Sequence, residues 1–238
     1  MSVYKAAAYQ STQSESRLPY EATPLTGGVP MIGVGSIVGN LADLMYLATT
    51  LTDSDMLIQS SYDEDECVDG QLLCTLEHGT TEDPFHRHTL KRRVKQAPGV
   101  ASAVVRCRDM VFLDCIGQIQ LPNGEHVGYV LYRTVEIPEC NEINGIVRAD
   151  GTACYLLRPQ GPNSMEVFMH SQIDARGNSM DAVTAVSAAN ALIAIWKMPW
   201  GGQNKKLAWM LKQAGAKRSQ DGAASVERMT MNQCPVCS

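Results

Sequence analysis

Residues 180–199 read MDAVTAVSAANALIAIWKMP, and this stretch decides the fold. From Met180 to Met198 it runs about nineteen residues with almost no charge. Its alanines allow a helix to approach a sheet closely, and larger apolar side chains give it bulk, namely Val183, Val186, Ile193 and Trp196. A helix this apolar is expected to be buried on most of its circumference.

The flanks of this helix set its predicted limits. Asn178 and Ser179 are candidate N-terminal caps, and Pro199 is expected to end the helix before Gly201 and Gly202 loosen the chain. A second, basic amphipathic helix is predicted to follow and to stop at Gly215, with its apolar face formed by Leu207, Met210, Leu211 and Ala214.

The chain before the helix favours strands. Alternation and β-branched residues predict them at Met31–Val38, Gln71–Leu76, Thr89–Lys95, Val100–Arg106, Met110–Gln120, His126–Val135, Ile146–Ala149, Ala153–Arg158 and Met165–Ile173. Asn123-Gly124 is typical of a hairpin turn, and Pro159–Asn163 indicates another reversal. Only one short helix, after the candidate cap Asn40, interrupts the strands. An antiparallel, strongly curved sheet in an α+β fold is therefore expected.

Four short segments stand out along the chain, namely Arg108–Leu113, Val135–Glu139, Gly145–Asp150, and Val167–Asp174 followed by Arg176-Gly177. In their residues and their order these segments resemble the START (steroidogenic acute regulatory-related lipid transfer) family. The resemblance covers roughly residues 31–198. It implies a helix-grip fold of the START/Bet v 1 type, in which a curved antiparallel sheet is closed by a long C-terminal helix over a hydrophobic cavity. It also implies non-catalytic binding of a lipid or other hydrophobic ligand, with transfer at membranes.

The end of the chain resembles oomycete-type proteins in which a FYVE zinc finger follows a START domain. Asn232-Gln233-Cys234-Pro235-Val236-Cys237 has the form of the opening of that finger. A tetrahedral zinc site needs four ligands, so Cys234 and Cys237 make an incomplete metal site. No cofactor is expected, and zinc only if a complete finger follows.

Composition and charge limit the function classes. The 238 residues are 45% hydrophobic with a net charge of −5, which argues against nucleic acid as a partner. Basic runs at 87–95 and 205–218 suit transient contact with an anionic membrane surface. We predict a flexible lead-in over 1–28, a lipid-binding domain over 29–214 and a polar linker over 215–238. No signal peptide is evident at the start, and a cytoplasmic protein, peripheral to membranes, is expected.

The resemblance and the strand alternation together name a candidate ligand site. Its predicted lipid-binding residues are Phe112, Asp114, Ile116, Arg133, His170, Val183, Val186 and Ile193. In sterol-carrying relatives a basic residue stands at the position aligned with Asp114, so an acid here departs from the sterol pattern. If Asp114 is buried it needs a partner, and Arg106, Arg133 and His170 are the candidates. The loop Ile137–Asn144 and the helix near Val183–Ile195 would form the gate.

Two further interpretations of function stay open. One is an adaptor in which the START-like body is only a platform, with its FYVE finger lost or truncated. The other is a cyclase- or isomerase-like enzyme of the same fold that uses Asp114 or His170 as a general base. His86-x-His88 on a strand would point both rings one way, which suits a metal, but with Arg87 and Lys91 beside them a surface pair is favoured.

Overall fold

The computed structural model describes residues 2–5, 27–63, 66–97, 99–177 and 181–221. They fall into two compact units, Met1–Gly202 and Gln203–Ser238. The first unit contains one nine-stranded sheet in the order β1-β2-β9-β8-β6-β5-β4-β3, with β7 beside β5. All neighbours are antiparallel except the short β5–β7 pair. The predicted antiparallel sheet is confirmed.

The strands are β1 Ser2–Lys5, β2 Val29–Val38, β3 Cys67–Glu77, β4 Arg87–Lys95, β5 Arg108–Gln120, β6 His126–Thr134, β7 Val147–Arg148, β8 Asp150–Pro159 and β9 Ser164–Asp174. The helices are α1 Leu41–Ala48, α2 Asp53–Asp63, α3 Asp181–Ile193 and α4 Met198–Asp221, with 3₁₀ turns η1 at Gly99–Ala103 and η2 at Ala194–Lys197.

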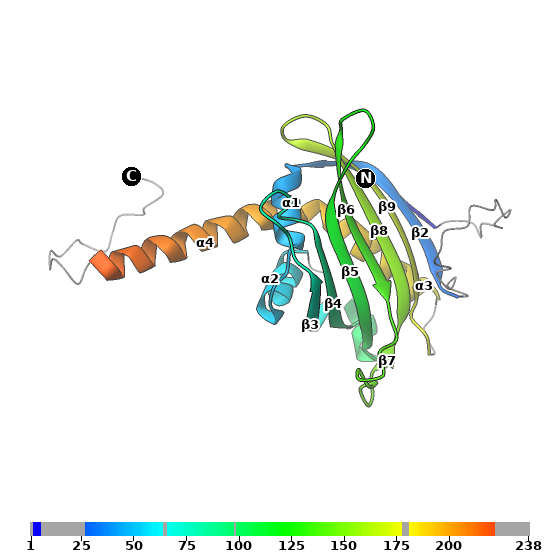
Figure 1. The fold of residues 1–238 in the computed structure, drawn as a ribbon. Helices are drawn as coiled ribbons and strands as arrows, with labels where there is room; N and C mark the ends of the chain where they lie inside the picture. The colour runs from blue at the N-terminus through cyan, green and yellow to red at the C-terminus, as the bar shows by residue number, and fades with distance from the viewer. Residues whose placement is uncertain (1, 6–26, 64–65, 98, 178–180, 222–238) are drawn as a thin grey trace. The chain divides into compact units, whose positions relative to one another are not determined.

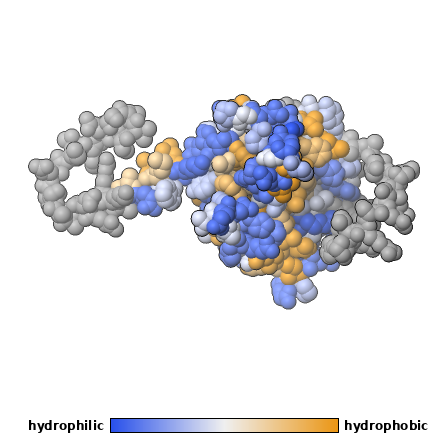
Figure 2. Space-filling model, turned by 45° about the horizontal axis from the view of Figure 1, so that its top comes forward, coloured by the Kyte–Doolittle hydropathy of each residue, from blue (hydrophilic) through white to orange (hydrophobic). Residues whose placement is uncertain are grey.

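Helix α3 lies behind the sheet (Figure 1) and packs on β2 and β9. The core fills the space between them with aliphatic and methionine side chains, including Met31, Met165, Val167, Met169, Leu192 and Ile195. The opposite face of the sheet is not purely polar, because Val34, Leu156 and Phe168 are exposed on it. In the view of Figure 2, hydrophobic areas lie between hydrophilic ones on the surface of the molecule.

Local signals explain most of the elements. Asn40 caps α1, since its Oδ1 accepts a hydrogen bond of 2.8 Å from the Asp43 backbone N–H. Gly124, at φ 85°, makes the predicted β5–β6 hairpin turn. The candidate caps Asn178 and Ser179 lie outside the described residues.

One strand was predicted wrongly, and one helix was not predicted. The strand expected at Val100–Arg106 is the 3₁₀ turn η1 and a loop, because no strand among the described residues pairs with it and Val100 and Val104 face solvent. Helix α2 was missed, although Thr52 is its N-cap: the Asp55 backbone N–H donates to Thr52 Oγ1 at 3.1 Å, and Asp55 Oδ2 accepts from the N–H of the preceding residue Leu51 at 3.0 Å.

The long apolar helix is less buried than expected. Ala188 and Leu192 belong to the core, but Val186 is 52% exposed, and Ile193 and Trp196 also face solvent. The side of the helix that faces the sheet therefore consists of alanines together with Leu192, and of the predicted bulky residues only Val183 points to the cavity.

The apolar helix ends before Pro199, since α3 stops at Ile193 and the 3₁₀ turn η2 follows it. The loosening predicted at Gly201-Gly202 is wrong, as is the stop at Gly215, because α4 is continuous from Met198 to Asp221. Pro199 occupies its first turn, where a missing N–H costs nothing. Gly201 and Gly202 allow α4 to pack closely against α1. A Cβ atom on Gly201 would lie 2.6 Å from Leu47 Cδ2, and a Cβ atom on Gly202 would lie only 1.9 Å from the Asp43 carbonyl oxygen. They are needed for close helix packing rather than for a hinge.

Substituting Gly202→Ala is expected to lower the free energy of unfolding by about 1–3 kcal/mol or more, because backbone atoms of α1 cannot move aside as a side chain can. Urea denaturation measures the loss. The matched control is Gly215→Ala in the same helix, where an added Cβ meets no atom within 4 Å. That variant should be no less stable than the parent, since alanine is the better helix former. Equal stability of the two variants would contradict the packing role of Gly202.

By length and hydropathy alone, one helical run among the described residues, Ala182–Gly215, could cross a membrane. Its first half contributes Ala188, Leu192 and Ile195 to the core, which accounts for much of its apolar character. The segment Val29–Leu51, also apolar, forms β2 and α1.

Candidate functional site

A cavity of about 180 Å³ lies between the inner face of the sheet and α3. The sheet contributes Phe112, Val130, Tyr132, Ala153 and Tyr155, and the helix contributes Val183, Thr184, Ser187, Ala188 and Ala191. Every other residue of β5, β6 and β8 faces inward, so strand alternation places one apolar face of each strand on the cavity. The helix side is lined mainly by small residues, which leaves room beneath the helix.

Three aromatic rings form a row across neighbouring strands at the cavity wall. Phe112 and Tyr132 meet edge to face with ring centroids 5.6 Å apart, and Tyr132 and Tyr155 do so at 6.1 Å. The Tyr155 hydroxyl donates a hydrogen bond of 3.3 Å to the Ala191 carbonyl oxygen. The row therefore ties the sheet to α3 across the cavity.

One end of the cavity is cationic. Arg93, Lys95, Arg106 and Arg108 line it, and the Arg93 guanidinium lies 5.8 Å from the centre of the Phe112 ring. Arg108 joins this end to the turn after β9, since its Nε donates to the Ala175 carbonyl oxygen at 3.1 Å. An apolar chamber with positive charge at one end suits an amphipathic, anionic guest.

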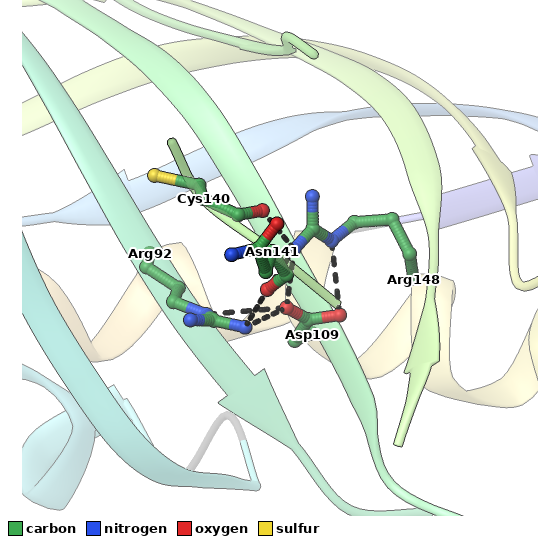
Figure 3. A network of polar contacts seen from close by, with 5 residues as sticks. All are labelled: Arg92, Asp109, Cys140, Asn141 and Arg148. Atoms are coloured by element: carbon green, nitrogen blue, oxygen red, sulfur yellow. Dashed lines mark hydrogen bonds and ion pairs between the residues drawn. The ribbon is translucent and has the colours of Figure 1, made fainter. Parts of the chain in front are cut away.

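A second polar group, the Asp109 cluster, consists of Asp109, Arg92 and Arg148 with the carbonyl groups of Cys140 and Asn141 (Figure 3). Asp109, on β5, is fully buried; its Oδ2 accepts from Arg92 Nη2 at 2.6 Å and from Arg148 Nη2 at 3.0 Å. Arg148 Nη2 also donates to the Cys140 carbonyl oxygen at 3.0 Å, and Arg92 Nη2 to that of Asn141 at 3.1 Å. One carboxylate thus orients two guanidinium groups that hold the loop after β6.

The third polar group is a buried ion pair. Lys91 Nζ donates to Asp114 Oδ2, and each side chain is less than 5% exposed. Burial lowers the pKa of Lys91, although the charge and hydrogen bond of Asp114 act in the opposite direction. None of the partners expected for Asp114 was correct, because Lys91 on the adjacent strand takes that place.

The predicted site residues fall into three groups. Phe112 and Val183 line the cavity. Asp114 and Ile116 are buried beside it in the sheet but are not part of its lining, and Val186 and Ile193 are exposed on α3. Arg133 and His170 stand at strand positions that alternate with the lining residues, which puts them on the outer face of the sheet. Cys234 and Cys237 lie outside the described residues.

Sequence reasoning missed the tyrosines and the small residues of the cavity. Tyr132 and Tyr155 are separated from Phe112 by long stretches of chain, and only the register between strands brings the three together. The expected gate loop 137–144, all of which the structure describes, contributes no residue to the lining. The alternation in β6 and β8 is the signal that points to the tyrosines.

Comparisons with known proteins agree with this architecture. Residues 93–202 match the family model of the START domain. Human STARD10 is similar in structure, with a TM-score of 0.53 and 16% identity over 84% of this chain and 74% of that one. Human StAR-related lipid transfer protein 5 has a TM-score of 0.53 and 14% identity over 75% and 77%. A STAR-related lipid transfer protein fragment from Xanthomonas axonopodis has a TM-score of 0.51 and 14% identity over 74% and 87%.

No curated protein matches the chain in sequence. The antiparallel sheet, the long C-terminal helix and the structural matches confirm the predicted START/Bet v 1 helix-grip fold, and the START family model matches residues 93–202 of the chain. The resemblance of residues 232–237 to the opening of a FYVE finger stays a prediction.

Proposed function

Because residues 93–202 match a START domain, we propose that this protein binds a lipid or other hydrophobic molecule in the cavity between the sheet and α3, and exchanges it at membranes without catalysis. The observation that carries the proposal is the cavity itself. A row of aromatic rings on the sheet forms one side of the cavity, and small residues of α3 form the other. Arginines and a lysine line one end.

The small size of the cavity requires α3 to move before a lipid can enter. Sites for drug-sized ligands span roughly 300–1,000 Å³, and this cavity holds about 180 Å³. A complete lipid therefore enters only if α3 moves away from the sheet. A hydrogen bond from the Tyr155 hydroxyl to the Ala191 carbonyl oxygen crosses the cavity, and Val183, Ala188 and Ala191 add apolar contacts from the helix. Such contacts re-form without leaving polar groups unpaired, which suits a lid.

Residues near the basic end of the cavity favour a membrane as the place of exchange. The turn η1 lies in the chain between Ala97 and Val105, which both line the cavity. On and beside it, Val100 and Val104 are 94% and 84% exposed. Exposed valines next to Arg106 fit the boundary between the acyl chains and the anionic headgroups of a membrane. A cytoplasmic protein peripheral to membranes is the corresponding location.

Of the two other functions, the platform remains the second candidate, and the small volume of the cavity is the observation that favours it. A catalytic role for Asp114 or His170 is less well supported. Asp114 is neutralised by Lys91, and neither side chain lines the cavity.

Substituting Ala191→Trp is expected to abolish ligand binding, because the indole would fill much of the cavity beneath α3. Mass spectrometry of organic extracts from natively purified protein should find a lipid class in the parent and none in the variant. Uptake from liposomes containing anionic lipid should fall in parallel. The matched control is Val186→Trp on the same helix, since Val186 is exposed and lies outside the lining.

Thermal unfolding of both variants shows whether each is folded, and Ser187→Phe, at another lining position, repeats the test if Ala191→Trp is not. A parent that carries no lipid and takes none from liposomes would overturn the carrier function in favour of the platform. Equal uptake by Ala191→Trp and Val186→Trp would exclude this cavity as the binding site.

A further inference from the structure

Three potential metal ligands meet at the end of the β3–β4 hairpin, away from the cavity. Glu77 is the last residue of β3, His88 is the second residue of β4 and its partner in the register, and His86 directly precedes β4. Glu77 Oε2 lies 2.8 Å from His86 Nε2 and 3.0 Å from His88 Nδ1. The two imidazole rings are tilted, with centroids 4.9 Å apart.

The spacing of these atoms is close to that of ligands around one ion. Zinc bound at about 2.0–2.1 Å in tetrahedral geometry has its ligand atoms about 3.3 Å apart. An increase of a few tenths of an ångström in the two observed distances, within the range of side-chain rotation, therefore makes room for an ion. All three side chains retain solvent access, with exposed fractions of 37%, 29% and 52% for His86, His88 and Glu77. A hydrated ion can thus reach them directly.

The loop between the strands holds this arrangement in place before any ion binds. Thr80 Oγ1 accepts from the Asp83 N–H at 3.0 Å, and the Asp83 carbonyl oxygen accepts from the backbone N–H groups of Thr80 and His86 at 3.1 and 3.3 Å. These bonds fix the backbone on which His86 is carried. Preorganisation of this kind reduces the entropy that binding must overcome.

The positive charges beside the histidines in the sequence do not face them. Arg87 and Lys91 stand opposite Ile116 and Phe112 in the register, and both of these belong to the inner face of the sheet. His86 and His88 alternate with them and therefore face outward. The objection that neighbouring cations would repel a metal ion at this site does not hold in the folded protein. Cys115, the register partner of His88 on β5, adds a half-buried thiol on the same outer face.

We propose that Glu77, His86 and His88 bind one divalent transition-metal ion, zinc in preference, with a fourth coordination position open to water. Two imidazoles and one carboxylate with an open position form a ligand set that zinc accepts in proteins. The ion would join the two strands of the β3–β4 hairpin where they separate. The site is independent of the cavity and of the ligand that the cavity binds.

The experiment uses the full chain with Cys234→Ser and Cys237→Ser, so that zinc binding by those thiols does not contribute. Isothermal titration with Zn²⁺ should show one equivalent bound to this parent. Glu77→Gln, His86→Gln and His88→Gln should each weaken binding by at least about tenfold, because loss of even an outer-shell partner costs 10–100-fold. The matched control is His126→Gln, an exposed histidine outside the cluster, which should bind as the parent does.

Two further measurements make the result specific. Zn²⁺ should raise the midpoint of thermal unfolding of the parent and of His126→Gln but not of His88→Gln, and all variants should unfold alike without metal. Co²⁺ should give the visible absorption of a four-coordinate site only when the three ligands are intact. The proposal is overturned if the parent takes up no zinc, or if uptake is the same in His88→Gln as in His126→Gln.

Discussion

Replacing Asp109 with alanine is expected to lower the free energy of unfolding by about 3–5 kcal/mol, because the change leaves two guanidinium groups without their shared counter-ion. Asp109 has no exposed surface, whereas Arg92 and Arg148 retain a little, which places the expectation at the lower end of that range. Urea denaturation gives the loss. Hydrogen exchange should show faster exchange of amides in the loop 135–146, since Arg92 and Arg148 hold its carbonyl groups.

A matched pair of controls separates the charge of Asp109 from its shape. Asp109→Asn keeps the shape and two oxygen or nitrogen atoms but removes the charge, so most of the loss should remain. Glu125→Gln removes the carboxylate of the exposed Arg158–Glu125 pair and should cause no comparable loss. If Asp109→Asn were as stable as the parent, hydrogen-bond geometry rather than charge would hold the cluster together.

Acid provides a second test of the same cluster. Burial alone would raise the pKa of Asp109, but hydrogen bonds from Arg148 and Arg92, together with their charges, hold it below its ordinary value of 3.8. A carboxylate whose pKa is lower in the folded state stabilises the fold fully above the unfolded value, and this contribution is lost as the pH falls through the folded value. The stability difference between the parent and Asp109→Asn should therefore shrink below about pH 3.8.

Sequence periodicity was sufficient to predict the sheet and the helix that closes it. Strand alternation, the Asn123-Gly124 turn and the apolar run after Met180 are local signals, and each corresponds to an element of the structure. The break at Gly201-Gly202 was predicted wrongly because glycine was treated as a local helix breaker. Its actual role depends on α1, a distant segment whose backbone approaches too closely for a side chain. At these two positions the packing of α4 against α1 outweighs the low helix propensity of glycine.

The candidate site was only partly predictable for a related reason. Alternation correctly put Phe112 and Asp114 on one face of β5, but the partner of Asp114 depends on the register between β4 and β5. In that register Thr89 stands opposite Asp114 and Lys91 opposite Phe112, so Lys91 reaches Asp114 diagonally. The basic run 87–95 was interpreted as one surface for contact with an anionic membrane, whereas a strand divides its side chains between two faces of the sheet.

Substituting Lys91→Met is expected to lower the free energy of unfolding by about 3–5 kcal/mol, because it leaves the carboxylate of Asp114 buried without a cation. Asp114 Oδ1 already accepts no hydrogen bond among the described residues, so no other partner compensates for the loss. The double variant Lys91→Met with Asp114→Leu should recover most of the stability. Urea denaturation of the parent, both single variants and the double variant gives the coupling energy of the pair.

The direction of the recovery follows from the cost of burying both charges. Burial, together with the charges of Arg93 and Arg87, keeps the pKa of Lys91 below its ordinary value despite the charge and hydrogen bond of Asp114, which indicates that this environment disfavours the lysine charge even with its partner present. Two apolar side chains of similar volume avoid that cost, so a double variant as stable as the parent is the expected outcome. Since neither residue lines the cavity, the double variant should also take up ligand as the parent does. A stable double variant that no longer binds ligand would instead assign the pair to recognition of the ligand's polar group.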